Sequence, residues 1–452
     1  MSAGATGDCA IGVVRLSGPE AIHIARALFR RTTGKPRSRW QSRRLYHGLV
    51  VDPVTAAAVD EVLLSVMRAP RSYTGQDVVE LSCHGGVAVR EVLRLALAEG
   101  ARTAERGELT LRAYLAGKLD LAQAEAVADA VAARTPAALS LAVSQMSGAL
   151  SERVRALRQA LLPIYAHLEA SVDFDEDDIA PIDRESAVMQ LTSVGERLDG
   201  VLATARWGRL VRDGIKVALV GRPNAGKSSL LNALLQQDRA IVTPFPGTTR
   251  DVIEESIDLF GVPAVLADTA GIVDSNDPVE RLGVERSRRA IDAADVLVLT
   301  LDGSLPLTEQ DRAVAALARR PTVIALNKAD LPVRVTEPDA AGLVTDAKVV
   351  SVSALTGQGM DALRTALADA GGWQSERSGE TPGVVTSARH RDTLGRARQS
   401  LADAIAALEE GVAIDAVSTD VRNALSTLGE ITGETVTEDV LTEIFSRFCI
   451  GK

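Results

Sequence analysis

Cysteine is scarce in this sequence, and long apolar runs are missing from it. The 452 residues include only three cysteines, Cys9, Cys83 and Cys449, whose wide separation does not suggest a metal-binding motif. No apolar stretch approaches the length needed to cross a bilayer, and the first residues do not resemble a signal peptide. These absences predict a protein of the reducing cytoplasm with no membrane association.

Positive charge is not in excess either. The chain has 50 lysines and arginines against 60 aspartates and glutamates, which gives a formal net charge of −10. This balance argues against a protein that coats nucleic acid, although a local basic surface can still hold RNA. The length predicts two or three domains, and no repeat of the solenoid type is present.

The pattern of hydrophobic residues changes along the chain. Residues 1–118 mix short expected strands, at positions 11–16, 62–67 and 78–81, with helical runs, which predicts an α+β domain. The segment that follows, residues 119–212, shows helical periodicity alone. Within it, a proline at position 163 is expected to kink or divide a helix.

Residues 213–375 alternate short apolar strands with helices. This alternation predicts a parallel-rich, doubly wound sheet with helices on both faces. The expected strands are residues 217–220, 264–267, 296–301, 322–326 and 349–352. Helical periodicity returns in residues 376–452, so the α/β domain is expected to be inserted between two arms of one helical domain. Two separate helical domains remain the alternative.

The motif GRPNAGKS at residues 221–228 follows an expected strand and precedes an expected helix. Its glycines allow the backbone to wrap phosphate oxygens and to present N–H donors at a helix N-terminus. Lys227 supplies a positive charge to the β- and γ-phosphates, and the Ser228 hydroxyl is a ligand for Mg²⁺. A glycine-rich turn without a ligand is the alternative, and the flanking strand and helix argue against it.

Two further loops indicate which base is bound. The motif NKAD at residues 327–330 follows an expected strand, and the Asp330 carboxylate can accept from both donors of the guanine edge. Adenine lacks that pair of donors and would leave a buried carboxylate unpaired, which is costly. Ser353 and Ala354 fit the loop whose backbone N–H contacts the guanine O6. The sequence therefore predicts GTP, and not ATP, as the substrate.

The motif DTAG at residues 268–271 ends another expected strand. Asp268 can hold Mg²⁺ through water, and the Gly271 N–H can contact the γ-phosphate. The next residue, Ile272, stands where Ras-like proteins carry the glutamine that orients the attacking water. Either hydrolysis is slow, or another group positions that water, and the nearby candidates are Asp274, Asp277 and Glu280.

The segment at residues 243–250, TPFPGTTR, is expected to be the second nucleotide-dependent switch. Its Thr249 is placed to close over Mg²⁺ when the γ-phosphate is present. At the C-terminus, Gly451 and Lys452 are consistent with an ordinary helix end, and Cys449 by itself with a buried small hydrophobe.

Together these residues identify a family. The chain resembles the MnmE (also called TrmE) tRNA-modification GTPases over nearly its whole length, and the segments 118–126 and 448–452 are its most specific features. Besides the nucleotide motifs, the matching segments are VRLSG at 14–18, YTGQDVVEL at 73–81, HGG at 84–86, GKLDLAQAEA at 117–126, GTTRD at 247–251 and FCIGK at 448–452.

The resemblance implies a domain order and an assembly. An N-terminal α+β domain for dimerisation and folate binding precedes an all-helical domain, into which a Ras-like P-loop GTPase domain is inserted. The chain is expected to form a homodimer whose GTPase domains meet during hydrolysis.

The resemblance also implies how GTP is hydrolysed. A K⁺ ion replaces the arginine finger, with Asn224 supplying a side-chain oxygen and Thr243, Phe245 and Thr248 supplying carbonyl oxygens. Glu280 corresponds to the acid that orients the water, so it is assigned a catalytic role together with Lys227. The nucleotide and its ions are thus assigned to Asn224, Ala225, Gly226, Lys227, Ser228, Ser229, Thr243, Thr248, Thr249, Asp268, Thr269, Ala270, Gly271, Asn327, Lys328, Asp330, Ser353 and Ala354.

The family works with an FAD-dependent partner, MnmG (also called GidA), on tRNA. Together they build aminomethyl or carboxymethylaminomethyl groups at C5 of wobble uridines, and 5-formyl-tetrahydrofolate or a related folate donates the one-carbon unit. By correspondence Arg15, Glu80, Lys118 and Lys452 would contact this folate, with Cys449 close by. Apart from the family, a salt bridge would account for Arg15 and Glu80, and a solvated chain end for Lys452.

A regulatory GTPase of ribosome assembly, which binds RNA without modifying it, is the rival hypothesis. Its nucleotide motifs could look the same. The C-terminal segment 449–452, the N-terminal domain and the absence of a basic RNA-binding tail distinguish the two hypotheses and favour tRNA modification.

Overall fold

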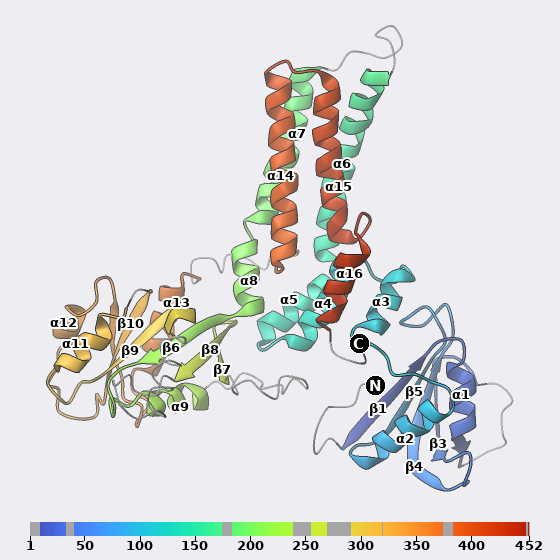
Figure 1. Ribbon diagram of the computed structural model, residues 1–452. Helices are drawn as coiled ribbons and strands as arrows, with labels where there is room; N and C mark the ends of the chain where they lie inside the picture. Colours follow the sequence, from blue (N-terminus) through green and yellow to red (C-terminus); the bar gives the residue numbers. More distant parts are fainter. Residues whose placement is uncertain are drawn as a thin grey trace.

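The computed structural model describes residues 10–32, 40–173, 183–237, 255–268, 291–318, 320–373, 383–448 and 451. Figure 1 shows three parts: a small sheet covered by helices near the N-terminus, a long helical bundle, and a second sheet with helices on both sides. The expected fold class is confirmed, because an α+β unit is followed by helices, by a doubly wound α/β unit and by further helices.

The N-terminal unit is a five-stranded antiparallel sheet of order β1-β5-β4-β3-β2. Side chains along β1 alternate between buried and more exposed positions, so one face packs against α1 and α2. The elements are β1 (Ile11–Ser17), α1 (Ala21–Leu28), β2 (Phe29–Arg31), β3 (Arg44–Val51), β4 (Ala58–Met67), β5 (Val78–His84) and α2 (Val87–Ala98). The three strands expected from the sequence lie within β1, β4 and β5, whereas β2 and β3 were not predicted.

The helices on either side of the second sheet in sequence form one bundle. Leu161 and Leu198, which precede that sheet, belong to the same buried cluster as Leu401 and Leu428, which follow it. The alternative of two separate helical domains is therefore wrong. The helices that contribute to this cluster are α4 (Leu121–Ala132), α6 (Ala149–Asp173), α7 (Arg184–Leu202), α8 (Ala205–Asp213), α14 (Ala388–Glu409) and α15 (Ile414–Thr432). Helices α3 (Glu108–Leu115) and α16 (Glu438–Ser446) pack with α4 in a smaller cluster, and α5 (Pro136–Met146) packs against the second sheet. Across the described parts of the chain, we find no helix with the length and hydropathy of a membrane span.

Of the two outcomes expected at Pro163, a kink or a division of the helix, the division is wrong, because α6 continues through the proline. Proline removes one backbone N–H donor and so leaves the carbonyl four residues earlier without its helical partner. Pro163 lies on the exposed side of α6, where water can reach such a carbonyl. Leu161 and Ile164 are both buried in the bundle core and hold the helix on either side of the proline.

The second sheet has six strands in the order β11-β10-β9-β6-β8-β7, all parallel except β7, which runs antiparallel to β8. Val217 and Leu219 face one hydrophobic cluster, and Ala218 and Val220 face another on the opposite side. Both faces are thus buried, as predicted for a doubly wound sheet. Its elements are β6 (Ile215–Val220), α9 (Lys227–Gln237), β7 (Glu255–Leu259), β8 (Val262–Asp268), β9 (Val296–Asp302), α11 (Glu309–Ala315), β10 (Thr322–Asn327), α12 (Glu337–Ala341), β11 (Lys348–Ser351) and α13 (Met360–Gly371).

Candidate functional site

The nucleotide motifs gather at one edge of the second sheet. In the parallel register, Asn327 at the end of β10 pairs with Asp302 at the end of β9, and Leu326 pairs with Ser351 at the end of β11. The central strand β6 has β8 on one side and β9 on the other, so the chain changes direction across the sheet at β6. Open α/β sheets bind ligands at the carboxyl ends of the strands at such a point.

The glycines of residues 221–228 are required by close contacts of the backbone. A Cβ atom at Gly221 would lie 2.4 Å from the carbonyl oxygen of Thr300, and one at Gly226 would lie 2.2 Å from Nδ2 of Asn327. Gly226 also has a φ of +93°, a conformation that side chains disfavour. The neighbouring Asn224 adopts a φ of +63° and is exposed, which asparagine tolerates better than most residues. The loop therefore curves tightly around the end of β6.

Lys227, the first residue of α9, folds back over this loop. Its Nζ donates to the carbonyl oxygens of Gly221 and Arg222, each at 3.0 Å, and the residue is buried. The ammonium group is thus held above the concave side of the loop, where it can meet phosphate oxygens. Ser228 and Ser229 follow on the exposed start of α9. A loop of N–H donors, a helix start and a lysine together form an anion-binding cradle.

The Asn327 side chain joins this loop to the remaining motifs. Its Nδ2 donates to the carbonyl oxygen of Ala225 at 3.1 Å, and its Oδ1 accepts from the backbone N–H of Ala354 at 3.1 Å. Asn327 is 2% exposed, so both bonds are shielded from water. One buried amide therefore fixes residues from three separate motifs in one site.

Asp330 is exposed beside these loops, and the buried Ser353 forms a hydrogen bond to its carboxylate. The Ser353 hydroxyl donates to Oδ1 of Asp330 at 2.5 Å and accepts from the backbone N–H of Thr356 at 3.2 Å. Ser353 is fully buried, so its position is set by packing. The carboxylate is oriented by this bond, with acceptor capacity left for a pair of N–H donors.

Asp302 is a residue of the site that the sequence reasoning missed. Its Oδ2 lies 2.6 Å from Nζ of Lys328, whose backbone adopts a φ of +66°. Burial by itself would raise the pKa of Asp302, but hydrogen bonds from Lys328 and Ser304 hold that pKa below its ordinary value. Asp302 therefore stays ionised and fixes the Lys328 side chain at the rim of the site. A lone acidic residue directly after the buried run of β9 was the available signal.

Several predicted positions lie outside the described residues, and their assignments stay predictions. The structure gives the backbone of Asp268 as the last residue of β8, next to Leu219 of β6. The positions outside the description are Thr243, Phe245, Thr248, Thr249, Thr269, Ala270, Gly271, Glu280, Cys449 and Lys452, as well as the alternatives Asp274 and Asp277.

The structure brings together two of the residues expected to contact folate. Arg15 and Glu80 face each other on β1 and β5, with Nε of Arg15 at 2.7 Å from Oε1 of Glu80. Arg15 also lines a cavity of about 500 Å³ whose walls include Ile24, Leu93 and Leu97. Largely apolar walls beside a paired arginine and carboxylate suit a flat, partly polar ligand.

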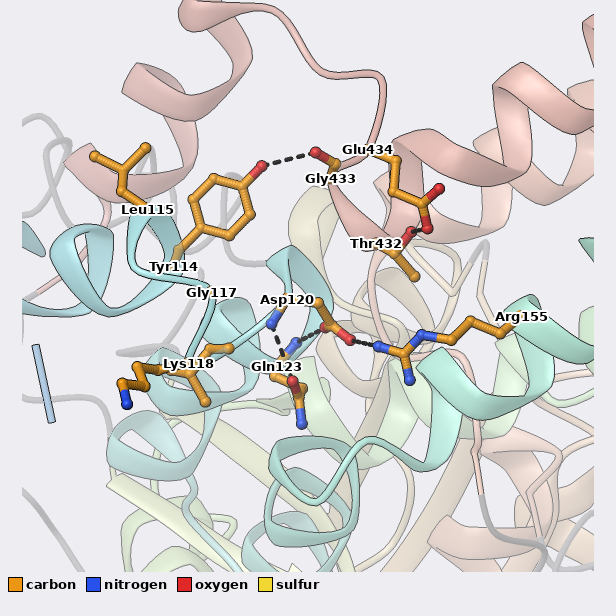
Figure 2. A pocket seen from close by; sticks show the side chains of 11 residues that line it. Tyr114, Leu115, Gly117, Lys118, Asp120, Gln123, Arg155, Thr432, Gly433 and Glu434 are labelled. Atoms are coloured by element: carbon orange, nitrogen blue, oxygen red, sulfur yellow. Dashed lines mark hydrogen bonds and ion pairs between the residues drawn. The ribbon is translucent and has the colours of Figure 1, made fainter. Parts of the chain in front are cut away.

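Lys118 lines a different cavity, also of about 500 Å³, between the start of α4 and the end of α15. Figure 2 shows Asp120 turned toward Arg155, with which it forms a 2.6 Å ion pair, and Tyr114 donating to the carbonyl oxygen of Gly433. Neither of these two cavities is lined by both Lys118 and Arg15. Lys118 and Arg15 thus line two separate cavities of the described structure, and their assignment to one folate site stays a prediction.

Comparisons with known proteins cover nearly the whole chain. A family model described as the GTP-binding protein TrmE N-terminus matches residues 1–118, and one described as the MnmE helical domain matches residues 121–449. An Aquifex aeolicus Era variant bound to GDP.AlF4- is 26% identical, with a TM-score of 0.28, and the match covers 34% of this chain and 56% of that one.

Curated relatives match over nearly their full length. A protein of Roseiflexus sp. (strain RS-1) is 48% identical and one of Heliobacterium modesticaldum is 46% identical, each over 99% of this chain and 97% of the relative. A protein of Alkaliphilus oremlandii is 42% identical over the same shares. All three are named tRNA modification GTPase MnmE. With matches of this extent on a chain that carries the geometry described above, the protein belongs to the MnmE family.

Proposed function

We propose that the protein hydrolyses GTP and takes part in the modification of tRNA at C5 of wobble uridines. The observation that carries the GTPase assignment is the buried Asn327 amide, which holds the phosphate loop and the base-selecting loops in one site. Membership of a family whose curated members are named tRNA modification GTPases supports the choice of substrate.

In this proposal the chain binds GTP at both ends of the nucleotide. The backbone N–H groups of residues 224–229 and the Lys227 ammonium bind the phosphates, and Asp330 accepts from the guanine edge. Ser228 and Thr249 would hold Mg²⁺, which would supply positive charge to the β- and γ-phosphates. The exposed Ser228 at the start of α9 fits that role.

Two further residues are proposed to act on the γ-phosphate. Asn224 is exposed on the phosphate loop and can offer its side-chain oxygen to K⁺, with carbonyl oxygens of Thr243, Phe245 and Thr248. Bound K⁺ supplies the positive charge that an arginine finger supplies elsewhere. Glu280 is proposed to orient the attacking water, because Ile272 has no polar atom for that task.

The modification step is proposed to use the rest of the chain. A homodimer in the cytoplasm would bind a 5-formyl-tetrahydrofolate-type donor through Arg15, Glu80, Lys118 and Lys452, and would act on tRNA with the FAD-dependent MnmG partner. Arg15 on β1 and Glu80 on β5 fit a folate, because Glu80 can accept hydrogen bonds from pterin N–H groups while Arg15 lines a largely apolar cavity. The folate supplies the one-carbon unit.

Wobble uridines in cells that lack this protein test the proposed function. Mass spectrometry is expected to show loss of the C5 aminomethyl-type groups, with recovery from the wild-type gene but not from Lys227→Ala, which lacks the phosphate-binding ammonium. A ribosome-assembly GTPase would leave these nucleosides intact and alter the ratio of ribosomal subunits. Intact wobble modification in the deleted strain would therefore overturn the proposal.

Base selection is tested with Asp330→Asn. An amide cannot accept from both donors of guanine, so GTP affinity should fall by about 10- to 100-fold and XTP should become the preferred nucleotide. Competition binding with GTP and XTP measures the change. Asp361→Asn, on the exposed side of α13, is the matched control and should leave the preference unchanged. An unaltered GTP preference in the Asp330 variant would rule out the base assignment.

The K⁺ proposal is tested by turnover in different salts. At matched ionic strength, the rate in K⁺ should exceed that in Na⁺ by at least about tenfold, since arginine-finger charges contribute about 10³- to 10⁵-fold. Asn224→Ala should lose most of the advantage of K⁺ while GTP binding persists. Equal rates in the two salts would refute a K⁺ site.

Glu280→Ala should separate binding from hydrolysis. GTP affinity should remain near wild type, because the phosphate loop and Asp330 do not involve Glu280. Single-turnover hydrolysis should fall by about 100-fold, the typical cost of a misplaced reacting group. If Glu280 merely begins a helix, its loss should lower stability slightly and leave turnover near normal.

The matched control is Glu309→Ala, which removes an exposed acidic residue from the first turn of α11. Titration of GTP affinity and single-turnover measurement on both variants distinguish the two roles. A rate for the Glu280 variant within a few-fold of wild type would remove this residue from the mechanism.

A further inference from the structure

The helices α4 and α5 contact the chain where it enters the GTPase domain. Arg212 lies in the last turn of α8, directly before β6 and the phosphate loop. Its Nε lies 2.9 Å from Oδ1 of Asp129 on α4; the Asp129 side chain is 13% exposed and that of Arg212 is 32% exposed. The direction in which α8 leads into β6 is thus fixed by an ion pair to α4.

The same two helices contact the chain where it leaves the GTPase domain. Gln145 on α5 is 2% exposed, and its Nε2 donates to the carbonyl oxygen of Val384 at 2.7 Å and to the Thr386 hydroxyl at 3.0 Å. Val384 and Thr386 stand just before α14 begins. The segments by which the chain enters and leaves the GTPase domain are therefore both held by the neighbouring helices α4 and α5.

A third contact reaches the sheet itself. The Thr135 hydroxyl, at the start of α5, donates to the carbonyl oxygen of Gly261 in the turn between β7 and β8 at 2.9 Å. Ala138 belongs to the buried cluster on that side of the GTPase sheet. Because α5 packs on the sheet, a shift of the GTPase domain would act directly on the α4–α5 pair.

The other end of α4 is tied to the bundle. Glu125, one helical turn before Asp129, pairs with Arg389 and His390 of α14, and Arg389 also donates to the carbonyl oxygen of Glu430 on α15. Burial alone would raise the pKa of Glu125, but His390 and Arg389 lower it to about 2. On adjacent turns of α4, Glu125 thus binds the bundle helix α14, and Asp129 binds α8, which leads into the GTPase domain.

The Asp129–Arg212 pair differs from the Glu125 cluster in its surroundings. A cavity of about 180 Å³ adjoins it and is also lined by Gln145, Asp213 and Thr386. Burial raises the pKa of Asp129, and Arg212 offsets only part of that rise. The walls of this cavity combine alanine and leucine side chains with the polar groups of Gln145, Asp213 and Thr386. Separation of the pair would let water enter it beside these polar groups, so opening would not leave two bare charges.

We propose that Asp129 and Arg212 are positioning residues that form a latch between α4 and α8. Closed, the latch holds the GTPase domain in one orientation relative to the bundle. Open, it lets α8 and β6 turn while Glu125 keeps α4 attached to α14. That the latch affects tRNA modification rests on the function proposed above. That it fixes the orientation of the GTPase domain does not rest on that function.

A distance between the two domains tests the latch without tRNA or a partner. Spin labels would be placed at Met189→Cys on α7, 70% exposed, and at Asp361→Cys on α13, whose side chain is 95% exposed. Cys9 and Cys449 would be replaced by serine, and labelled chains mixed with excess unlabelled chains so that assembly adds no further distances. We expect one narrow distribution with the latch intact.

Asp129→Asn and Arg212→Gln should each broaden or shift that distribution, whereas Arg212→Lys, which keeps the charge, should preserve it more fully. The matched control is Arg398→Gln, which breaks an ion pair to Asp199 within the bundle and should change nothing. Circular dichroism and GTP affinity establish that each variant is folded. Folded latch variants with a wild-type distance distribution would overturn the proposal.

The second measurement is the number of GTP molecules hydrolysed per modified uridine in the complete reaction. Both latch variants should raise it by at least about fivefold, the lower end of usual coupling between sites, with GTP affinity unchanged. A purely stabilising pair would lower the melting temperature and leave this ratio at the wild-type value, which would also overturn the proposal. Wild-type protein that yields no modified uridine would refute the proposed function, and the distance measurement would still decide on the latch.

Discussion

The buried amide of Asn327 is the interaction on which the nucleotide site depends. It accepts from the backbone of Ala354 and donates to that of Ala225, so the loops after β6, β10 and β11 cannot move independently. An unpaired amide at 2% exposure would be costly, and both of its bonds are satisfied only when all three loops are in place. The close approach of Gly226 to Nδ2 of Asn327 shows how little space separates these loops.

The same principle governs the junction between the GTPase domain and the bundle. Two chain crossings and one sheet turn are each fixed by a buried or half-buried polar side chain from α4 or α5. Polar contacts of this kind restrict the relative orientation of two packed surfaces, because an amide or a guanidinium forms good hydrogen bonds in few orientations. Of the charged pairs of Glu125 and Asp129, the second adjoins a cavity and has the more exposed arginine.

Much of the fold could be predicted from the sequence because the patterns that indicate its strands and helices are local. The strands around 217–220 and 296–301 are short apolar runs between turn signals, and the bundle helices carry a clear helical period. Elements without such a signal were missed: β7 is a short antiparallel edge strand, and β3 includes a glycine and exposed residues. The helix is not divided at Pro163, one of the two outcomes expected there, because burial of Leu161 and Ile164 outweighs the lost backbone bond.

By itself, the sequence determined which chemical groups are available for nucleotide binding, because glycine, lysine and aspartate at fixed spacings on strand ends leave few alternatives. It also indicated one helical domain in two arms. Only the tertiary structure decided that Asp302 fixes Lys328, that Lys118 and Arg15 line separate cavities, and that Arg212 meets Asp129. The two contacts join residues 26 and 83 positions apart, and no local pattern encodes such a pairing: it follows from how the sheet and the bundle pack together.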